Sequence, residues 1–269
     1  MSREERIMKR VKEHYDEACS LGKEVVVVFL QGSQNYECDE YSENYQSDID
    51  TKCIILPTLN DIVCGKAPYS STHICANNEH IDIKDIRVMF EMFKKQNSSY
   101  IELLFTKYYY VNPKYADLVA ELKSLSERIA RMHPNAALRA MAGTSMEKFK
   151  ALEHPYPGTM DKIEKFGYDP KQLHHILRLN DLMKRFVAAD EPYESILVPH
   201  HAGYLMQVKK GLYSLQEARR LAQVTDQDNK RIKDENLTAE EFIDKETEQA
   251  LVDLKVKFIK KFLKESLES

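Results

Sequence analysis

The sequence lacks the features that mark membrane proteins, secreted proteins and zinc ribbons. It has no apolar run long enough to span a bilayer, and its first residues, MSREERIMKR, are too charged for a signal peptide. Its five cysteines are an odd number without a CxxC pair, which is typical of free thiols in a reducing compartment rather than of a disulfide framework or a zinc site. We therefore expect a cytoplasmic protein that does not contact membrane.

Length and charge leave the partner open. A chain of 269 residues can form one large or two modest domains, and a net charge of −4 gives no general preference for nucleic acid. Lysine and arginine outnumber aspartate and glutamate between Arg128 and Arg220. This basic half suits an anionic substrate, but an ordinary solvated helical surface explains it equally well.

The stretch from Glu24 to Leu56 has the most informative pattern. Val25 to Leu30 is a continuous β-branched and aromatic run, which predicts a strand buried on both faces. Gly32 and Ser33 follow it with a Cβ-free backbone, exposed N–H groups and a hydroxyl, all of which suit a phosphate. A second strand begins at Asp48 and Asp50, whose period-2 spacing places both carboxylates on one face, where they can share a divalent cation such as Mg²⁺.

A third carboxylate follows in HIDIKDIRV, residues 80–88, which alternates as a half-exposed strand does. Asp82 and Lys84 share one face, and Ile81 and Ile83 the other. Asp82 joins Asp48 and Asp50 only if the sheet sets the two strands side by side, and otherwise it is a surface aspartate on an edge strand. Asp85 falls on the face of the isoleucines and is the weaker candidate.

The remaining chain reads as short helices and loops over 58–78 and as mostly helical after residue 100. The most informative helix, residues 171–186, has an apolar stripe on one face and Lys171, His175 and Arg178 at i, i+4 and i+7 on another. Such a row of cations fits an anion opposite it, although pairing with Asp181 or with glutamates elsewhere is the alternative. The last helix is expected to begin with a capping box at Thr238 and Glu241. Its apolar stripe of Leu251, Leu254, Phe258 and Phe262 is expected to pack on the domain or on another subunit.

These residues together resemble a known family. Gly32-Ser33, then Ser47-Asp48-Ile49-Asp50, then Ile81-Asp82-Ile83 resemble the hGS…DxD…hDh signature of the DNA polymerase β-like nucleotidyltransferase superfamily. The segments GSQNY, SDIDTK, IELLFTKYY, GYDPKQLHHILRL and VKKGLYSLQEA are similar to the YcgL or RlaP type of predicted nucleotidyltransferases. That resemblance covers the chain from about Val25 to Glu217.

The order of the elements predicts an α+β fold, with a small mixed sheet and its helices followed by a helical region. With the resemblance, it implies a nucleotidyltransferase catalytic domain over residues 1–112 and a helical domain over 113–269 that completes the substrate cleft. The resemblance implies that Gly32 and Ser33 bind the nucleotide phosphates. Asp48, Asp50 and Asp82 would hold two Mg²⁺ ions, with Mn²⁺ as a substitute, and Asp82 would help to deprotonate the attacking hydroxyl. The row Lys171, His175 and Arg178 would contact phosphate or substrate.

The expected activity is transfer of a nucleoside monophosphate from a nucleoside triphosphate such as ATP to a hydroxyl, with release of pyrophosphate. An RNA end such as that of tRNA, as in RNA repair, and a protein side chain fit equally well as acceptors. The alternative is a non-catalytic nucleotide-binding or protein-interaction module of the same fold. Two departures from the family pattern are Glu37, which begins an acidic loop reaching to Gln46, and Asn97-Ser98-Ser99, which replaces an Asn-Pro.

Overall fold

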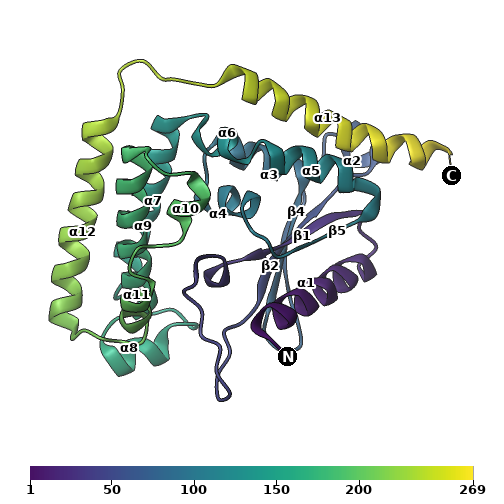
Figure 1. The fold of residues 1–269 in the computed structure, drawn as a ribbon. Helices are drawn as coiled ribbons and strands as arrows, with labels where there is room; N and C mark the ends of the chain where they lie inside the picture. The colour runs from purple at the N-terminus through teal and green to yellow at the C-terminus, as the bar shows by residue number, and fades with distance from the viewer. Residues whose placement is uncertain (269) are drawn as a thin grey trace. The chain divides into compact units, whose positions relative to one another are not determined.

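A computed structural model describes residues 1–268 of the protein, and the side chains of residues 1–264. It confirms the α+β class, with a five-stranded mixed sheet, its helices and a helical region that follows (Figure 1). The chain divides into two compact units. The first contains residues 1–35, 39–132 and the chain from Ile243 onward, and the second contains Tyr36–Cys38 and His133–Phe242.

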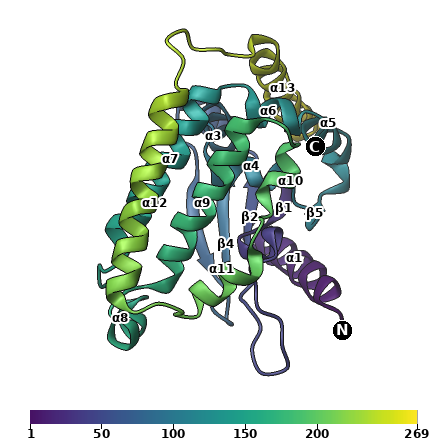
Figure 2. The same ribbon diagram turned by 60° about the vertical axis from the view of Figure 1, so that its left-hand side comes forward.

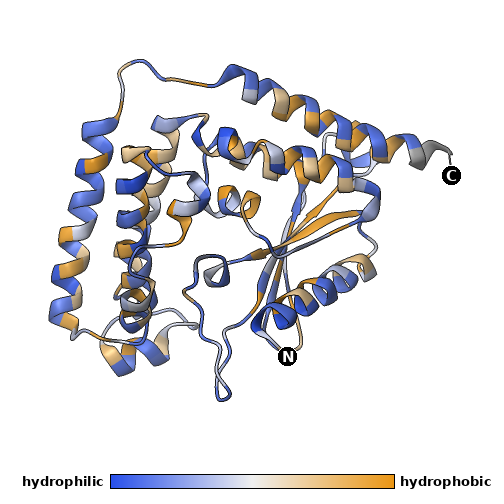
Figure 3. Ribbon diagram, in the orientation of Figure 1, coloured by the Kyte–Doolittle hydropathy of each residue, from blue (hydrophilic) through white to orange (hydrophobic). Residues whose placement is uncertain are grey.

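The sheet of the first unit has the order β3-β4-β2-β1-β5. The central strand β2 is antiparallel to β1 and parallel to β4. The outer pairs, β1 with β5 and β3 with β4, are antiparallel. Every residue of β1 except the last is buried, as its apolar run predicts (Figure 3). The strands are β1 (Val25–Gln31), β2 (Asp50–Ile55), β3 (Ser70–Ile74), β4 (His80–Asp85) and β5 (Tyr109–Val111).

One face of the sheet is covered by helix α1 (Arg3–Ser20). Buried Ile7, Val11 and Ala18 of α1 pack on a core that includes Val28 and Ile83 of the sheet. The carboxylate face is the other one, because Asp82 alternates with Ile81 and Ile83 along β4. Asp85 is buried, forms an ion pair with Arg87 and caps the next helix, which agrees with its lower rank as a candidate.

The final helix α13 (Lys245–Glu268) belongs to the first unit and packs on α3 (Ile86–Lys94). Phe258 is fully buried there, with its ring 6.4 Å from that of Phe90 and 6.2 Å from that of Tyr115. The predicted packing role of the last helix is therefore confirmed. The other helices of this unit are α2 (Leu59–Val63), α4 (Ser98–Ile101), α5 (Ala116–Ser124) and α6 (Ser126–Arg131).

The second unit is all-helical, and α9 (Pro170–Ala188) packs on α7, α11 and α12 (Figure 2). Its core includes Leu173 and Ile176 of α9 with Ala218 and Ala222 of α12, so the predicted apolar stripe is buried. The helices around α9 are α7 (Pro134–Ala151), α8 (Met160–Phe166), α10 (Tyr193–Leu197), α11 (Ala202–Lys209) and α12 (Leu215–Asn236).

Three features differ from the sequence-based expectations. Strand β3 lies in the segment where only a short helix and loops were expected, because its exposed edge position leaves no apolar run. Helix α13 begins at Lys245, so Thr238 does not cap it, and the side chain of Asn135 bonds the Thr238 backbone instead. The first unit continues to Met132 and includes α13, rather than ending at residue 112.

Among the residues that the structure describes, no helix has the length and apolarity that crossing a membrane requires.

Candidate functional site

The strand directions bring the predicted phosphate turn and the aspartates to one end of the sheet. Gln31, the last residue of β1, pairs with Asp50, the first residue of β2, because the two strands are antiparallel. Gly32 and Ser33 therefore leave the sheet beside Asp50. Strand β4 is parallel to β2 and also begins at this end, with Thr51 opposite Ile81 and Lys52 opposite Asp82.

The turn after β1 needs glycine. Gly32 has a φ of 101°, a backbone conformation that side chains with a Cβ rarely adopt. Ser33 then begins a short 3-10 helix, Ser33–Tyr36. The next two side chains fix the turn: the Gln34 amide donates to the Asp48 carbonyl at 2.6 Å, and the Asn35 amide donates to the Leu30 carbonyl at 3.0 Å.

The segment Asp48-Ile49-Asp50 alternates as predicted. Ile49 is fully buried among the core residues of the α1 face, whereas Asp48 is exposed and Asp50 is half-buried. The Asp50 carboxylate accepts a hydrogen bond from the His80 backbone N–H at 2.9 Å, which anchors it to β4. The backbone N–H of Ile49 donates to the Glu79 carboxylate at 3.1 Å.

Glu79 is the centre of a buried network that holds this segment on α1. Its Oε2 accepts from Arg10 Nε at 2.7 Å and lies 3.3 Å from His14 Nε2. His14 is fully buried, and its Nδ1 lies 2.9 Å from the Thr51 hydroxyl in β2. Burial alone would raise the pKa of Glu79, but hydrogen bonds from His14, Asn77, Arg10 and the Ile49 N–H outweigh it and lower the pKa to about 2.

Asp82 lies on the predicted face but is held by two lysines. Lys52 Nζ is 2.5 Å from one of its carboxylate oxygens, and Lys84 Nζ is 2.7 Å from the other. Lys52 is almost fully buried and its ammonium lies 4.5 Å from the centre of the Tyr100 ring. Burial lowers the pKa of Lys52 despite the charge of Asp82, and the two lysines keep the pKa of Asp82 below its usual value despite burial.

The carboxylates fit a divalent cation only in part. Asp48 and Asp50 offer hard oxygen ligands beside the Gly32 turn, which suit Mg²⁺. Asp82 is opposite Lys52, two residues along from Asp50, an offset of roughly 6.6 Å along the strands. In the part of the chain that is described, Asp48, Asp50 and Asp82 do not form a group whose ligand atoms all lie within 4.8 Å of one another. Asp82 becomes a ligand only if Lys52 and Lys84 release it.

In the second unit, helix α9 carries the predicted cationic row with three different environments. Lys171 is exposed, His175 is half-buried, and the guanidinium of buried Arg178 lies over the Tyr36 ring at 4.0 Å. Burial and the nearby Arg178 charge lower the pKa of His175 well below its usual value of 6.5, so the imidazole is neutral and repels neither neighbour. His174 Nδ1 donates to the Leu205 carbonyl at 3.1 Å, a structural contact within the unit.

Two residues near the aspartates of the first unit, Lys52 and Glu79, were not predicted from the sequence. Lys52 lies at i+2 from Asp50, so period-2 alternation alone places it on the carboxylate face. Glu79 had no local signal, since its partners lie on α1, far away in the sequence.

A cavity of about 520 Å³ in the first unit is lined by residues such as Glu24, Leu56 and Asp85, and it contains none of the predicted site residues.

Comparisons with known proteins do not assign a role to any of these residues. No protein-family model matches the chain, and no curated protein does. A solved structure aligns with it. That structure is a nucleotidyltransferase-like protein from Exiguobacterium sibiricum, with 10% identity and a TM-score of 0.29 over 85% of this chain and 74% of the other. We therefore base the proposed function on the residues of this chain.

Proposed function

We propose that the protein is a metal-dependent nucleotidyltransferase, which transfers a nucleoside monophosphate from a nucleoside triphosphate to a hydroxyl group and releases pyrophosphate. The observation that supports this most is the register of the sheet. It sets the Gly32-Ser33 turn beside Asp50, with Asp82 on the same face of the neighbouring parallel strand. Phosphate-binding backbone and metal-binding carboxylates are the two components that phosphoryl chemistry requires.

Each residue has a proposed role. The backbone N–H groups at Gly32 and Ser33, with the Ser33 hydroxyl, would donate hydrogen bonds to the nucleotide phosphates. Asp48 and Asp50 would hold Mg²⁺, or Mn²⁺ in its place, and the metal would neutralise the phosphate charge that otherwise repels an oxygen nucleophile. Gln34 and Glu79 would keep the two aspartates in place through the backbone groups of Asp48 and Ile49.

Asp82 and Lys52 are proposed to act as a pair. Lys52 and Lys84 both form ion pairs with the Asp82 carboxylate. An anionic nucleotide would attract both ammonium groups, and Asp82 would then be free to serve as a second-metal ligand and to accept the proton of the attacking hydroxyl.

Within the second unit, Lys171, His175 and Arg178 are proposed to contact phosphate or substrate. Arg178 suits this role because its guanidinium, held 4.0 Å from the centre of the Tyr36 ring, has a fork of N–H donors that matches phosphate. His175 contributes a neutral imidazole that can donate or accept one hydrogen bond.

The test is incorporation of label from α-labelled nucleoside triphosphates in the presence of Mg²⁺. We expect transfer by the wild-type chain and none by Asp48→Asn with Asp50→Asn. The matched control is Asp61→Asn, a partly exposed position in the capping box of α2 beyond the far end of β2, which should leave transfer intact. Undiminished incorporation by the double variant would eliminate the proposed metal ligands.

The acceptor class can be found in the same experiment. We propose either an RNA end, such as that of tRNA, or a protein side chain. Labelled products from a lysate, treated in parallel with ribonuclease and with protease, separate the two, since only one treatment releases the label from macromolecules.

One observation favours a second candidate, a nucleotide-binding module without catalysis. Lys52 and Lys84 both pair with the third carboxylate, Asp82. This pairing suits a protein that binds nucleotide without using Asp82 as a metal ligand or base. Nucleotide binding that is independent of Mg²⁺, with no release of pyrophosphate, would favour this candidate over the enzyme.

A further inference from the structure

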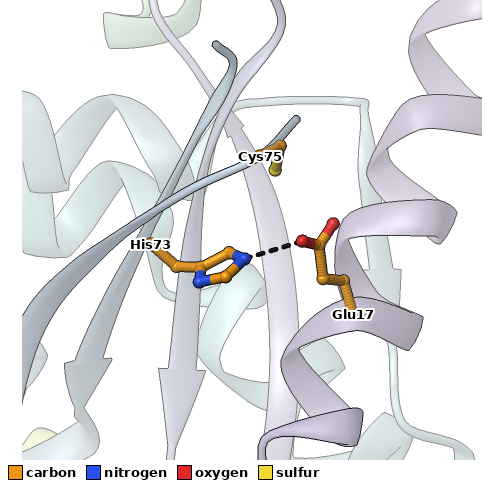
Figure 4. A group of neighbouring side chains, drawn as sticks. All are labelled: Glu17, His73 and Cys75. Atoms are coloured by element: carbon orange, nitrogen blue, oxygen red, sulfur yellow. Dashed lines mark hydrogen bonds and ion pairs between the residues drawn. The ribbon is translucent and has the colours of Figure 1, made fainter. Parts of the chain in front are cut away.

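A cluster of three side chains that could ligate a metal ion lies in the first unit, apart from the aspartates. Glu17 comes from the last turns of α1, His73 from the edge strand β3, and Cys75 directly follows that strand. One potential ligand atom of each lies within 4.8 Å of the others. Figure 4 shows the three side chains pointing toward one another. His73 Nε2 and Glu17 Oε1 are hydrogen-bonded at 2.6 Å.

We propose that Glu17, His73 and Cys75 bind a transition-metal ion of the Zn²⁺ class, with a fourth position left for water. Nitrogen, sulfur and carboxylate oxygen together are the ligand set that zinc prefers. A thiol disfavours Mg²⁺ and Ca²⁺, which bind through oxygen. The proposed site is therefore separate from the Mg²⁺ chemistry proposed at Asp48 and Asp50.

The backbone already holds the three residues in place. His73 pairs with Ile81 of β4, and the Cys75 N–H donates to the Glu79 carbonyl at 2.9 Å. Residues 73 and 75 lie two positions apart and so project from the same face of an extended chain. Ligand atoms on one tetrahedral zinc lie about 3.5 Å apart, given bonds of about 2.0–2.3 Å. Small side-chain movements from the present positions are sufficient.

The surroundings supply an outer shell and an entry path. His14 Nε2 lies 3.7 Å from the Cys75 sulfur, and His14 is itself fixed by Thr51. Such outer-shell contacts orient metal ligands. The side chains of Glu17 and His73 are 37% and 33% exposed, so an ion can reach them from solvent, whereas Cys75 is buried.

Binding must displace protons. Zinc binds cysteine as the thiolate, so the buried Cys75 must lose its proton when the metal enters. On binding, the Cys75 S–H bond breaks and its proton passes to water, while the sulfur keeps the electron pair for the metal. The His73 proton moves from Nε2 to Nδ1, which leaves Nε2 to bind. Affinity should therefore weaken as the pH falls.

The consequence for the fold is a link between α1 and the edge strand β3. An exposed edge strand has unpaired backbone groups, and a metal tie to the neighbouring helix holds it in place. With free zinc at 100 times its dissociation constant, the unfolded fraction should fall about 100-fold.

The experiment uses the full chain after dialysis against a chelator. Calorimetry with Zn²⁺ should give one ion per chain, and Co²⁺ should give a thiolate charge-transfer band in the near ultraviolet. We expect Glu17→Gln, His73→Gln and Cys75→Ser each to weaken zinc binding about tenfold or more. Cys64→Ser, an exposed thiol elsewhere, and Asp48→Asn with Asp50→Asn should bind as the wild type does.

Three results would overturn the proposal. These are no saturable zinc binding by the wild type, a Co²⁺ complex without the thiolate band, and equal affinity of the wild type and His73→Gln. Circular dichroism checks that each variant is folded. If Cys75→Ser, at a buried position, does not fold, Glu17→Gln still tests the site, because its side chain is partly exposed. The Asp48 and Asp50 variant separates this site from the proposed nucleotide site, because each can fail alone.

Discussion

Replacing Glu79 by glutamine tests the buried network beneath the aspartates. The side chain of Glu79 is 4% exposed and accepts hydrogen bonds from Arg10 and from the Ile49 N–H. Glutamine keeps an oxygen for Ile49 but removes the negative charge that faces Arg10. Each pKa unit corresponds to about 1.4 kcal/mol, so the fall in the pKa of Glu79 from 4.5 to about 2 corresponds to roughly 3 kcal/mol. A similar loss is usual when one partner of a buried ion pair is removed.

The assay is urea unfolding, followed by circular dichroism. At pH 7, Glu79→Gln should be about 3 kcal/mol less stable than the wild type. The folded carboxylate has the lower pKa, so its contribution is fully present above pH 4.5 and is lost as the pH falls through about 2. The gap between the two proteins should close across that range.

Glu13→Gln is the matched control. Glu13 also pairs with Arg10 on α1, but its side chain is 39% exposed, so the expected loss is below about 1 kcal/mol. Equal stability of Glu79→Gln and the wild type at pH 7, or a loss that does not change with pH, would refute the reasoning.

Three further predictions concern single residues of the proposed site. Gly32→Ala should cost about 1 to 3 kcal/mol in urea unfolding, because its φ of 101° strains any residue with a Cβ, whereas Gly203→Ala, within α11, should not destabilise the protein. Lys52→Met should raise the pKa of Asp82 in a carboxyl NMR titration, since that carboxylate then loses a buried cation, and an unmoved pKa would contradict the ion pair. His175 should protonate only well below pH 6.5 in an imidazole NMR titration, and the second unit should lose stability as the pH falls below 6.5, because the unfolded imidazole takes up the proton first.

The sequence predicted those parts of the site that depend on local pattern. The run Val25 to Leu30, the turn at Gly32 and the alternation about Ile49 each follow from side-chain chemistry and the period of a strand, and the structure has them as expected. The face assignment of Asp82 was also a local inference, and it is confirmed by the burial pattern of β4.

Long-range partners could not be predicted in this way. Glu79 has no local pattern to mark it, since its partners Arg10 and His14 lie far from it in the sequence. The Glu17 cluster was invisible for the same reason, and the absence of a CxxC pair argued against any zinc site. Strand β3 was missed because an edge strand with one exposed face has no apolar run to mark it.

The first unit also reaches further than expected. Local pattern marked the last helix as a packing element but did not say which residues it packs on. Phe258 contacts Phe90 and Tyr115, and these contacts return the end of the chain to the unit that contains the sheet.

The central claim is that nucleotide binds where β1 ends and β2 begins. Backbone amide NMR of the full chain, titrated with a non-hydrolysable nucleoside triphosphate and Mg²⁺, tests it most directly. The predicted result is a set of shift changes at Gly32, Ser33, Asp48 and Asp50 that depends on Mg²⁺ and disappears in Asp48→Asn with Asp50→Asn. Shift changes that leave these four residues unmoved would contradict the claim.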